Sequence, residues 1–295
     1  MTLERGTLFD PVLVTDLVDK VTGRSSLARL SAQSPIAFNG QKEFVFTMDS
    51  EIDVVAESGA KSHGGISLAP RTIVPIKVEY GARVSDEFMF ASEEERINIL
   101  RAFNDGFAKK LARGLDLMAF HGVNPRTGDP SAVIGDNNFD AAVDQSVEAP
   151  AGIEDANGVI ESAIALVDGG DVTGMAIAPT LRSALAGQVR TDGTPLFGDL
   201  AWGNAPATIT GLPVDVNKTV SDMATNNEVA YVGDFQGGFK WGYAKNIPLR
   251  VIEYGDPDNS GFDLQGYNQV YLRAEAYLGW GVLAPEAFAR VTEGV

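Results

Sequence analysis

The sequence predicts an α+β protein in which an extended arm and a long β-hairpin precede one long helix and a mixed α/β region. Three patterns predict this fold class. Apolar and polar residues alternate over residues 41–84, apolar residues recur at helical spacing over residues 92–122, and short apolar runs follow between residues 154 and 252. Residues 270–278 alternate again, which predicts a long strand near the end of the chain.

Residues 1–40 are predicted to form an extended arm that contains one short helix. Four apolar residues share one helical face: Val12, Leu13, Leu17 and Val18. Gly23 follows them as a stop signal. The arm has little of its own to pack against, so its cover must come from elsewhere.

Residues 41–84 are predicted to form a long β-hairpin. The first strand places Phe44, Phe46 and Met48 on one face. The returning strand places Val74, Ile76, Val78 and Tyr80 on one face. The glycine-rich segment 58–65 suits the turn between them, and Pro75 indicates an edge strand. An isolated two-stranded ribbon buries too little surface to offset its loss of conformational entropy. Another surface must therefore cover this hairpin.

The clearest helix is predicted over residues 92–122. It opens with the capping box Ser92 to Glu95, which places acidic residues where the helix dipole favours them. Gly122 and Pro125 mark its end. One face is apolar along the whole length, through Ile97, Leu100, Phe103, Phe107, Leu111, Leu115 and Met118.

Residues 124–152 are rich in Gly, Asp, Asn and Pro and predict loops or a domain boundary. A helix is expected over residues 154–168, and a second helix from Pro179 to near Ala186. Short strands are expected at residues 175–178, 212–216, 229–232, 239–243 and 249–252. Together these elements predict a mixed α/β domain.

The composition excludes several functional classes. Of the 295 residues, 23 are Lys or Arg and 40 are Asp or Glu, which gives a net charge of −17 and argues against a broad surface that neutralises phosphates. The chain has no cysteine, which excludes disulfides and thiolate chemistry. It shows neither a signal-peptide pattern nor an apolar run long enough to span a membrane, so we expect a soluble protein made in the cytoplasm.

No metal or cofactor site is expected. The segment that begins at Asp256 starts like a calcium loop, but its twelfth position is Tyr267 instead of a bidentate glutamate, so we interpret it as a surface turn. His63 and His121 have no metal-ligand spacing and are interpreted as structural. The sequence contains no dinucleotide fingerprint and no nucleophile-elbow serine.

Six short motifs follow one another between residues 178 and 288: Ala178 to Leu181, Asp192 to Leu196, Gly211 to Val214, Gly233 to Phe235, Val270 to Glu275 and Pro285 to Phe288. With the order of the predicted elements, they resemble the tailed-phage major capsid proteins of the Hong Kong 97-like fold. The resemblance implies an N-terminal arm at 1–40, an extended β-hairpin (the E-loop) at 41–85, and a spine helix in a peripheral domain at 86–151 and 266–295. It also implies a mixed α/β axial domain at 152–265.

The resemblance implies a structural protein of the virion, not an enzyme. Such subunits self-assemble in the host cytoplasm into hexamers and pentamers of an icosahedral head, which encloses double-stranded DNA without binding it specifically. Portal protein, and scaffolding or decoration proteins, would be further partners. The scaffolding extension that some members carry is not seen, so a separate scaffold or none is expected. No membrane partner is implied.

Some members of this family cross-link their subunits, joining a hairpin lysine to an asparagine with the help of a glutamate. Lys61, Asn268 and Glu275 stand at matching places here. The lysine amine attacks the asparagine carboxamide, ammonia leaves, and an isopeptide bond remains. At neutral pH only about one lysine in two thousand is unprotonated, so a base must accept the proton. Glu275 is the expected base, with its pKa raised by burial beside Tyr271 and Tyr277 at a subunit contact.

Asn268 and Glu275 are seven residues apart, which places them on opposite faces of one regular strand. Their convergence would therefore need several subunits, as in the family pattern. The alternative is structural: Lys61 as a solvated tip residue, Asn268 as a turn residue before the strand, and Glu275 as an ion-pair partner of Arg273 or another neighbour.

Three other interpretations stay open at this point. An encapsulin-type nanocompartment shares the fold but encloses protein. A soluble metabolic enzyme could use two carboxylates in a cleft, although no convergent constellation is seen. The hairpin could also fold back over its own α/β domain instead of projecting toward another copy.

Overall fold

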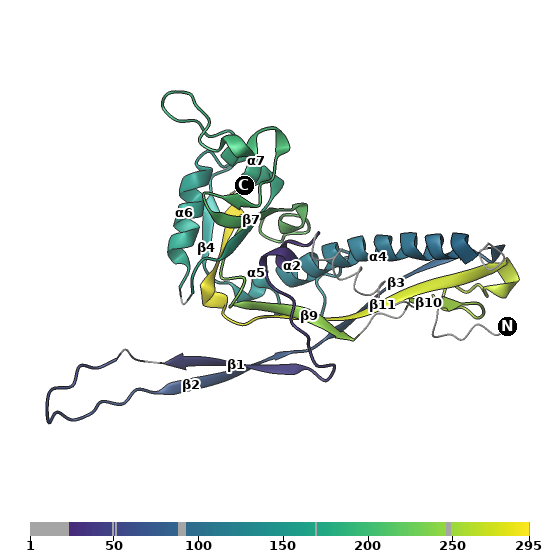
Figure 1. Cartoon of the computed structure of the whole chain (residues 1–295), viewed down its shortest axis with the longest axis horizontal. Helices are drawn as coiled ribbons and strands as arrows, with labels where there is room; N and C mark the ends of the chain where they lie inside the picture. The colour runs from purple at the N-terminus through teal and green to yellow at the C-terminus, as the bar shows by residue number, and fades with distance from the viewer. Residues whose placement is uncertain are drawn as a thin grey trace.

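The computed structural model describes residues 24–48, 50, 52–87, 93–168, 170–245 and 249–294. Figure 1 shows an elongated molecule with three parts: a compact region that holds the C-terminus, a long arm of helix and sheet, and a hairpin that projects away from both. None of the helices in the described ranges combines the length and apolarity that a membrane span needs.

The hairpin consists of strands β1 (Gln41–Met48) and β2 (Ile66–Ile73), which pair antiparallel with Gln41 opposite Ile73. They form a two-stranded sheet, so within the described residues no third strand joins them. Phe44 and Ile66 expose 61% and 65% of their surface, and Val54 in the connecting loop exposes 93%. The hairpin therefore stands out from the molecule, as Figure 1 shows, and does not fold back over the α/β region.

The prediction that residues 74–80 return along the first strand is wrong. Residues 66–73 take that place, and the chain then enters strand β3 (Ile76–Ser85), which pairs with strand β11 (Gln269–Val282) along Gln269–Leu278. Both 66–73 and 76–85 fit a strand pattern, so alternation alone could not choose the partner. Pro75, which lacks an N–H, lies between the two strands and separates them.

Strand β11 is the axis of a four-stranded sheet. One of its edges pairs with β3, and the other pairs with β10 (Leu249–Ile252) and then with β9 (Phe239–Lys245). Helix α4 (Glu93–His121) lies along this sheet in Figure 1, with Leu100, Phe107, Leu111, Leu115 and Met118 buried. The predicted long helix is thus confirmed, while its capping residue Ser92 lies outside the described residues.

A six-stranded sheet forms the compact region. Its strand order is β4 (Ser146–Ala149), β12 (Phe288–Glu293), β8 (Glu228–Gly233), β5 (Gly174–Ile177), β7 (Leu212–Val216) and β6 (Thr208–Ile209). Helices α6 (Ala156–Leu166) and α7 (Pro179–Ala186) confirm the two helices predicted here. The short elements α5 (Phe139–Ala142), η1 (Gly198–Gly203), η2 (Lys218–Val220) and η4 (Pro285–Ala287) complete it.

The sheet memberships differ from the continuous range 152–265 expected for one α/β domain. Strands β9 and β10, which lie inside that range, join β11 instead, and β4 and β12, which lie outside it, join the six-stranded sheet. The chain passes from β11 through η4 into β12, so its last strands serve both sheets. Sequence order alone could not show this crossing.

Much of the segment 25–36 is buried within the chain, which corrects the expectation that the arm has little of its own to pack against. Helix α2 (Ser26–Leu30) has Ser25 as its N-cap and buries Leu27 completely. The backbone N–H of Ser34 then donates to the Trp241 carbonyl at 2.9 Å. The short helix predicted at residues 12–18 lies outside the described residues.

A fully buried carboxylate, Asp116 of α4, holds helix α2 in place. It accepts hydrogen bonds from the Ser25 hydroxyl at 2.5 Å and from the backbone N–H groups of Ser26 and Leu27 at 3.0 and 3.3 Å. The side chains of Asn217 and Thr219 donate to it at 3.2 and 2.8 Å. Burial raises the pKa of Asp116 to about 6, and these donors oppose the rise.

A second buried network joins the end of α4 to the six-stranded sheet. The Nδ1 atom of His121 lies 2.8 Å from a carboxylate oxygen of Asp140, and its Nε2 atom lies 3.0 Å from the Thr219 carbonyl. Both partners are acceptors, so the imidazolium form, with two N–H groups, satisfies both. Tyr231 donates to Asp140 from the other side. The His121 ring is therefore held between the helix, α5 and the segment at Thr219.

The Asp116→Asn substitution should destabilise the chain. The amide would turn an NH₂ group toward hydrogen-bond donors, and leaving buried polar groups unpaired costs about 1–3 kcal/mol. Urea denaturation of the unassembled chain would measure the loss in free energy of unfolding. Asp129→Asn, at an exposed position, is the matched control and should change little. An unchanged midpoint for Asp116→Asn would contradict this account of α2.

The stability of the chain should also depend on His121 above neutral pH. Burial lowers the pKa of His121, but the hydrogen bond and charge of Asp140 raise it by more, so the net pKa lies above the ordinary 6.5. From 6.5 upward the unfolded chain releases a proton that the folded chain keeps, so the free energy of unfolding falls as the pH rises through the raised pKa. Urea titrations at several pH values should show this slope, and His121→Gln should remove it. Equal slopes in both proteins would refute the assignment.

Candidate functional site

The three residues predicted to form a cross-linking site lie in three different environments. Lys61 is exposed in the loop between β1 and β2. Asn268 is exposed at the end of the turn η3 (Gln265–Tyr267), directly before β11, with a left-handed φ of 53°. Glu275 lies within β11 and exposes only 7% of its surface.

One chain does not bring the lysine and the asparagine together. Figure 1 shows the tip of the β1–β2 hairpin at one end of the molecule and the start of β11 at the opposite end. Asn268 directly precedes β11, and Lys61 lies near the hairpin tip. A bond between these two side chains would therefore have to join different copies of the chain.

Glu275 is occupied by a lysine of the neighbouring strand. The Lys77 Nζ atom lies 2.8 Å from the Glu275 carboxylate, whereas Arg273 approaches it only to 4.0 Å. The hydrogen bond from Lys77 lowers the pKa of Glu275, which outweighs the effect of burial. This direction is the opposite of the one expected at a subunit contact. In the single chain Glu275 is thus an ionised ion-pair partner.

Tyr271 lies on the same strand face as Glu275, and a glycine of the neighbouring strand leaves room for its ring. Its ring lies over Gly81 of β3, where an added Cβ atom would overlap the phenol. The Arg273 guanidinium lies 5.5 Å from the centre of the same ring. Gly81 therefore permits a close contact between the strands, and the ring covers the backbone two positions from Glu79 and four positions from Lys77.

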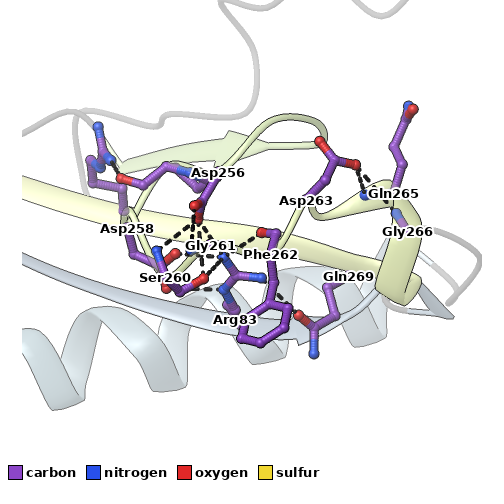
Figure 2. A network of polar contacts seen from close by, with 12 residues as sticks. Arg83, Asp256, Asp258, Ser260, Gly261, Phe262, Asp263, Gln265, Gly266 and Gln269 are labelled. Carbon is purple, nitrogen blue, oxygen red and sulfur yellow. Dashed lines mark hydrogen bonds and ion pairs between the residues drawn. The ribbon is translucent and has the colours of Figure 1, made fainter.

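The loop before Asn268 is fixed by one arginine, as Figure 2 shows. The Nη2 atom of Arg83 donates to Asp256 at 2.8 Å and to the Phe262 carbonyl at 2.9 Å, and its Nε atom donates to Asp258 at 2.9 Å. The hydrogen bond from Arg83 lowers the pKa of Asp258 well below its usual range. Ser260 and Gln269 also bond to Arg83.

This network explains why the segment resembles the start of a calcium loop. The carboxylates and the carbonyl oxygen converge on one positive charge, but that charge is the guanidinium of Arg83. The segment is a turn closed by a side chain from β3. It holds the backbone that leads to Asn268, whose carbonyl accepts from the Asp86 N–H at 2.9 Å.

Among the described residues, one group of side chains has the spacing of metal ligands: His121, Asp140 and Glu228, whose ligand atoms lie within 4.8 Å of one another. The histidine nitrogens already face the Thr219 carbonyl and Asp140. Glu228 in turn accepts from Asn226 at 3.0 Å and from Arg290 at 3.3 Å. The group thus satisfies its own charges, and we interpret it as an ion-pair network.

Sequence reasoning missed Lys77 and Arg83. Lys77 could have been found only from the pairing of β3 with β11. In that register Lys77 lies opposite Tyr277 and Glu79 lies opposite Glu275, so Lys77 is a diagonal neighbour of Glu275. Arg83 is separated from Asp256 by 173 positions, so no local pattern connects them.

The comparisons with known proteins agree with this architecture. Residues 6–292 match the model of the phage capsid family. A solved structure from Mycobacterium phage Ogopogo is 34% identical with a TM-score of 0.78 and covers 92% of each chain. One from Gordonia phage Cozz is 28% identical with a TM-score of 0.76, and covers 92% of this chain and 87% of that one.

A more distant likeness concerns the fold alone. A structure described as the capsid of an empty GTA particle is 16% identical with a TM-score of 0.65, and covers 92% of this chain and 90% of that one. No curated protein sequence matches the chain. The family match over nearly the whole length and the 34% identity over 92% of both chains lead to one conclusion. The protein belongs to the phage capsid family.

Proposed function

We propose that the chain is the major capsid protein of a tailed phage and builds an icosahedral head from hexamers and pentamers of itself. The observation that carries this proposal is the uncovered hairpin. Strands β1 and β2 have no third partner strand in the described chain, and Phe44, Val54 and Ile66 face solvent. Such a ribbon is marginal alone in water, so a stable hairpin needs a covering surface.

Identical copies can supply that surface. A hairpin that projects from one copy onto the body of the next makes a head-to-tail contact, and such contacts close into rings when the rotation permits. We propose that the described hairpin, 41–73, is the E-loop of the Hong Kong 97-like fold and that α4 is the spine helix. The β3–β11 sheet with α4 would form the peripheral domain, and the six-stranded sheet the axial domain.

The assembled head would enclose double-stranded DNA in the virion, after assembly in the host cytoplasm. The net charge of −17 supports a container wall that does not hold its contents through phosphate contacts. Portal protein, and scaffolding or decoration proteins, would be the other partners.

We also propose that neighbouring copies cross-link through Lys61 and Asn268. The exposed positions of both side chains at opposite ends of the molecule support a bond between copies rather than within one. The Lys61 amine would attack the Asn268 carboxamide carbon. The bond between that carbon and the Asn268 side-chain nitrogen would break, and ammonia would leave. Glu275 would take up the amine proton after an arriving hairpin displaces Lys77 and desolvates the carboxylate, which raises its pKa. Glu275 would then pass this proton to the departing amide nitrogen, which leaves as ammonia.

The Phe44→Asp variant tests the shell function. A charge on the exposed hairpin should prevent particles, seen by negative-stain microscopy, while urea denaturation of the unassembled chain stays unchanged because Phe44 is 61% exposed. Phe44→Leu keeps an apolar side chain and should still assemble. Normal particles from Phe44→Asp would show that the hairpin is not the assembly contact.

The cross-link has its own test in denaturing gels. Mature particles boiled in detergent should run as ladders, Lys61→Arg particles as monomers, and Glu275→Gln particles as ladders that form at least tenfold more slowly. Lys42→Arg, an exposed lysine of the same hairpin, is the matched control and should keep the ladder. Monomers from mature unmodified particles would refute the cross-link and leave the shell function standing.

A further inference from the structure

A surface rich in basic residues lies over the C-terminal half of helix α4 and over the two short elements that pack on it, α2 and η2. The chain as a whole carries a net charge of −17, so a gathering of positive charges is unusual here. We call this region the basic surface. It consists of exposed or partly exposed residues only: Arg24, Arg29, Lys109, Lys110, Arg113 and Lys218.

The lysines of α4 lie on the side of the helix where α2 and η2 pack. Lys109, Arg113 and Asp116 are four and three positions apart, so they form one stripe along the helix. Asp116 accepts from the N-cap of α2 and from the side chains of Asn217 and Thr219. Lys109 precedes Asp116 by about 10 Å along the helix axis. The cations of the three elements therefore share one side of the molecule.

Hydrogen bonds fix the spacing between these cations. Arg113 forms an ion pair with Asp222, whose backbone N–H donates to the Lys218 carbonyl at 2.9 Å. The side chain of Asn217, which precedes Lys218, donates to the Arg24 carbonyl at 3.3 Å. The fold itself therefore assembles the basic surface and holds it in place.

Four of the six cations have no carboxylate partner. Arg29 pairs with Asp215 at 2.6 Å, as Arg113 does with its own aspartate. In the described part of the chain the other cations form no ion pair: Arg24, Lys109, Lys110 and Lys218. Positive charges outnumber negative ones here even when Asp105 and the buried carboxylate of α4 are counted as charged.

The chemistry of this surface fits a phosphate backbone better than another protein. A protein interface has an apolar core, whereas the large exposed apolar side chains of the described residues lie mostly elsewhere, as Phe44, Ile52 and Val54 do on the hairpin. A phosphate backbone needs only closely spaced cations, because duplex DNA carries one negative charge per about 1.7 Å of its axis. Salt screens charges beyond about 8 Å, so the local excess decides the contact, and distant acidic residues weaken it without cancelling it.

We propose that the basic surface faces the interior of the head and contacts the phosphates of the enclosed double-stranded DNA. The contact is weak in each copy and is repeated in every copy of the shell. It reads no sequence, because cations that bind phosphates carry no information about the bases. The remaining acidic wall keeps the DNA from being held tightly. The inference rests on the proposed function, which supplies the ligand.

Binding of a short labelled DNA duplex to the unassembled chain tests this contact by fluorescence anisotropy at low salt. The logarithm of the affinity should fall with the logarithm of the salt concentration, with a slope between about −3 and −4 for the four unpartnered cations. The double variant Lys109→Gln, Lys110→Gln should bind roughly fivefold more weakly or worse, and its slope should be shallower by about 2. Lys42→Gln, at an exposed hairpin position, is the matched control and should change neither.

A second variant and a second ligand make the result decisive. Lys218→Gln, on a different element, should make the slope shallower by about 1. Urea denaturation of these variants should match that of the unmodified chain, because the side chains are exposed. Absence of duplex binding at low salt, or an unchanged slope in the double variant, would overturn the inference. Polyglutamate that binds as tightly as the duplex would overturn it too, in favour of an acidic protein as the partner.

Lysine acetylation of purified particles, read by mass spectrometry, tests the contact inside the head. Lys109 and Lys110 should react severalfold more slowly in DNA-filled particles than in emptied ones, whereas Lys42 should react equally in both. Equal rates at all three lysines would overturn this inference and leave the shell function standing. Failure of the unmodified chain to form particles would overturn both.

Discussion

The long strand β11 is the element on which the rest of the structure depends. It pairs with β3 along one edge and with β10 and β9 along the other, and it leads through η4 into β12 of the six-stranded sheet. Helix α4 packs beside it and reaches the same compact region through the networks of Asp116 and His121. Because β3 pairs with β11, the preceding ribbon β1–β2 has no further strand to join within the described part of the chain.

Much of the fold could be predicted because its signals are local. The face of α4 that includes Leu100 and Phe107, the proline that opens α7, and the alternation in β11 each lie within one element. The choice of strand partners could not be predicted, because residues 66–73 and residues 76–85 both form strands and the pairing is decided by contacts distant in sequence. The assignment of each strand to one of the two sheets could not be predicted either, because the backbone hydrogen bonds that decide it join residues far apart in the chain.

The candidate site shows the same limit. Lys61, Asn268 and Glu275 could be selected by their resemblance to a family pattern, but their surroundings depend on contacts between distant segments. Lys77 lies across the strand pair from Glu275 and reverses the expected direction of its pKa.

The clamp at Arg83 has a consequence for how the subunit meets its surroundings. A loop of carboxylates that waits for a free cation changes its order whenever the ionic content of the medium changes. Here the positive charge is tethered to β3, so it cannot be diluted, exchanged or removed by a chelator. The far end of the long arm thus carries its own permanent counter-ion, and its shape is set by the chain before any neighbour or salt is encountered.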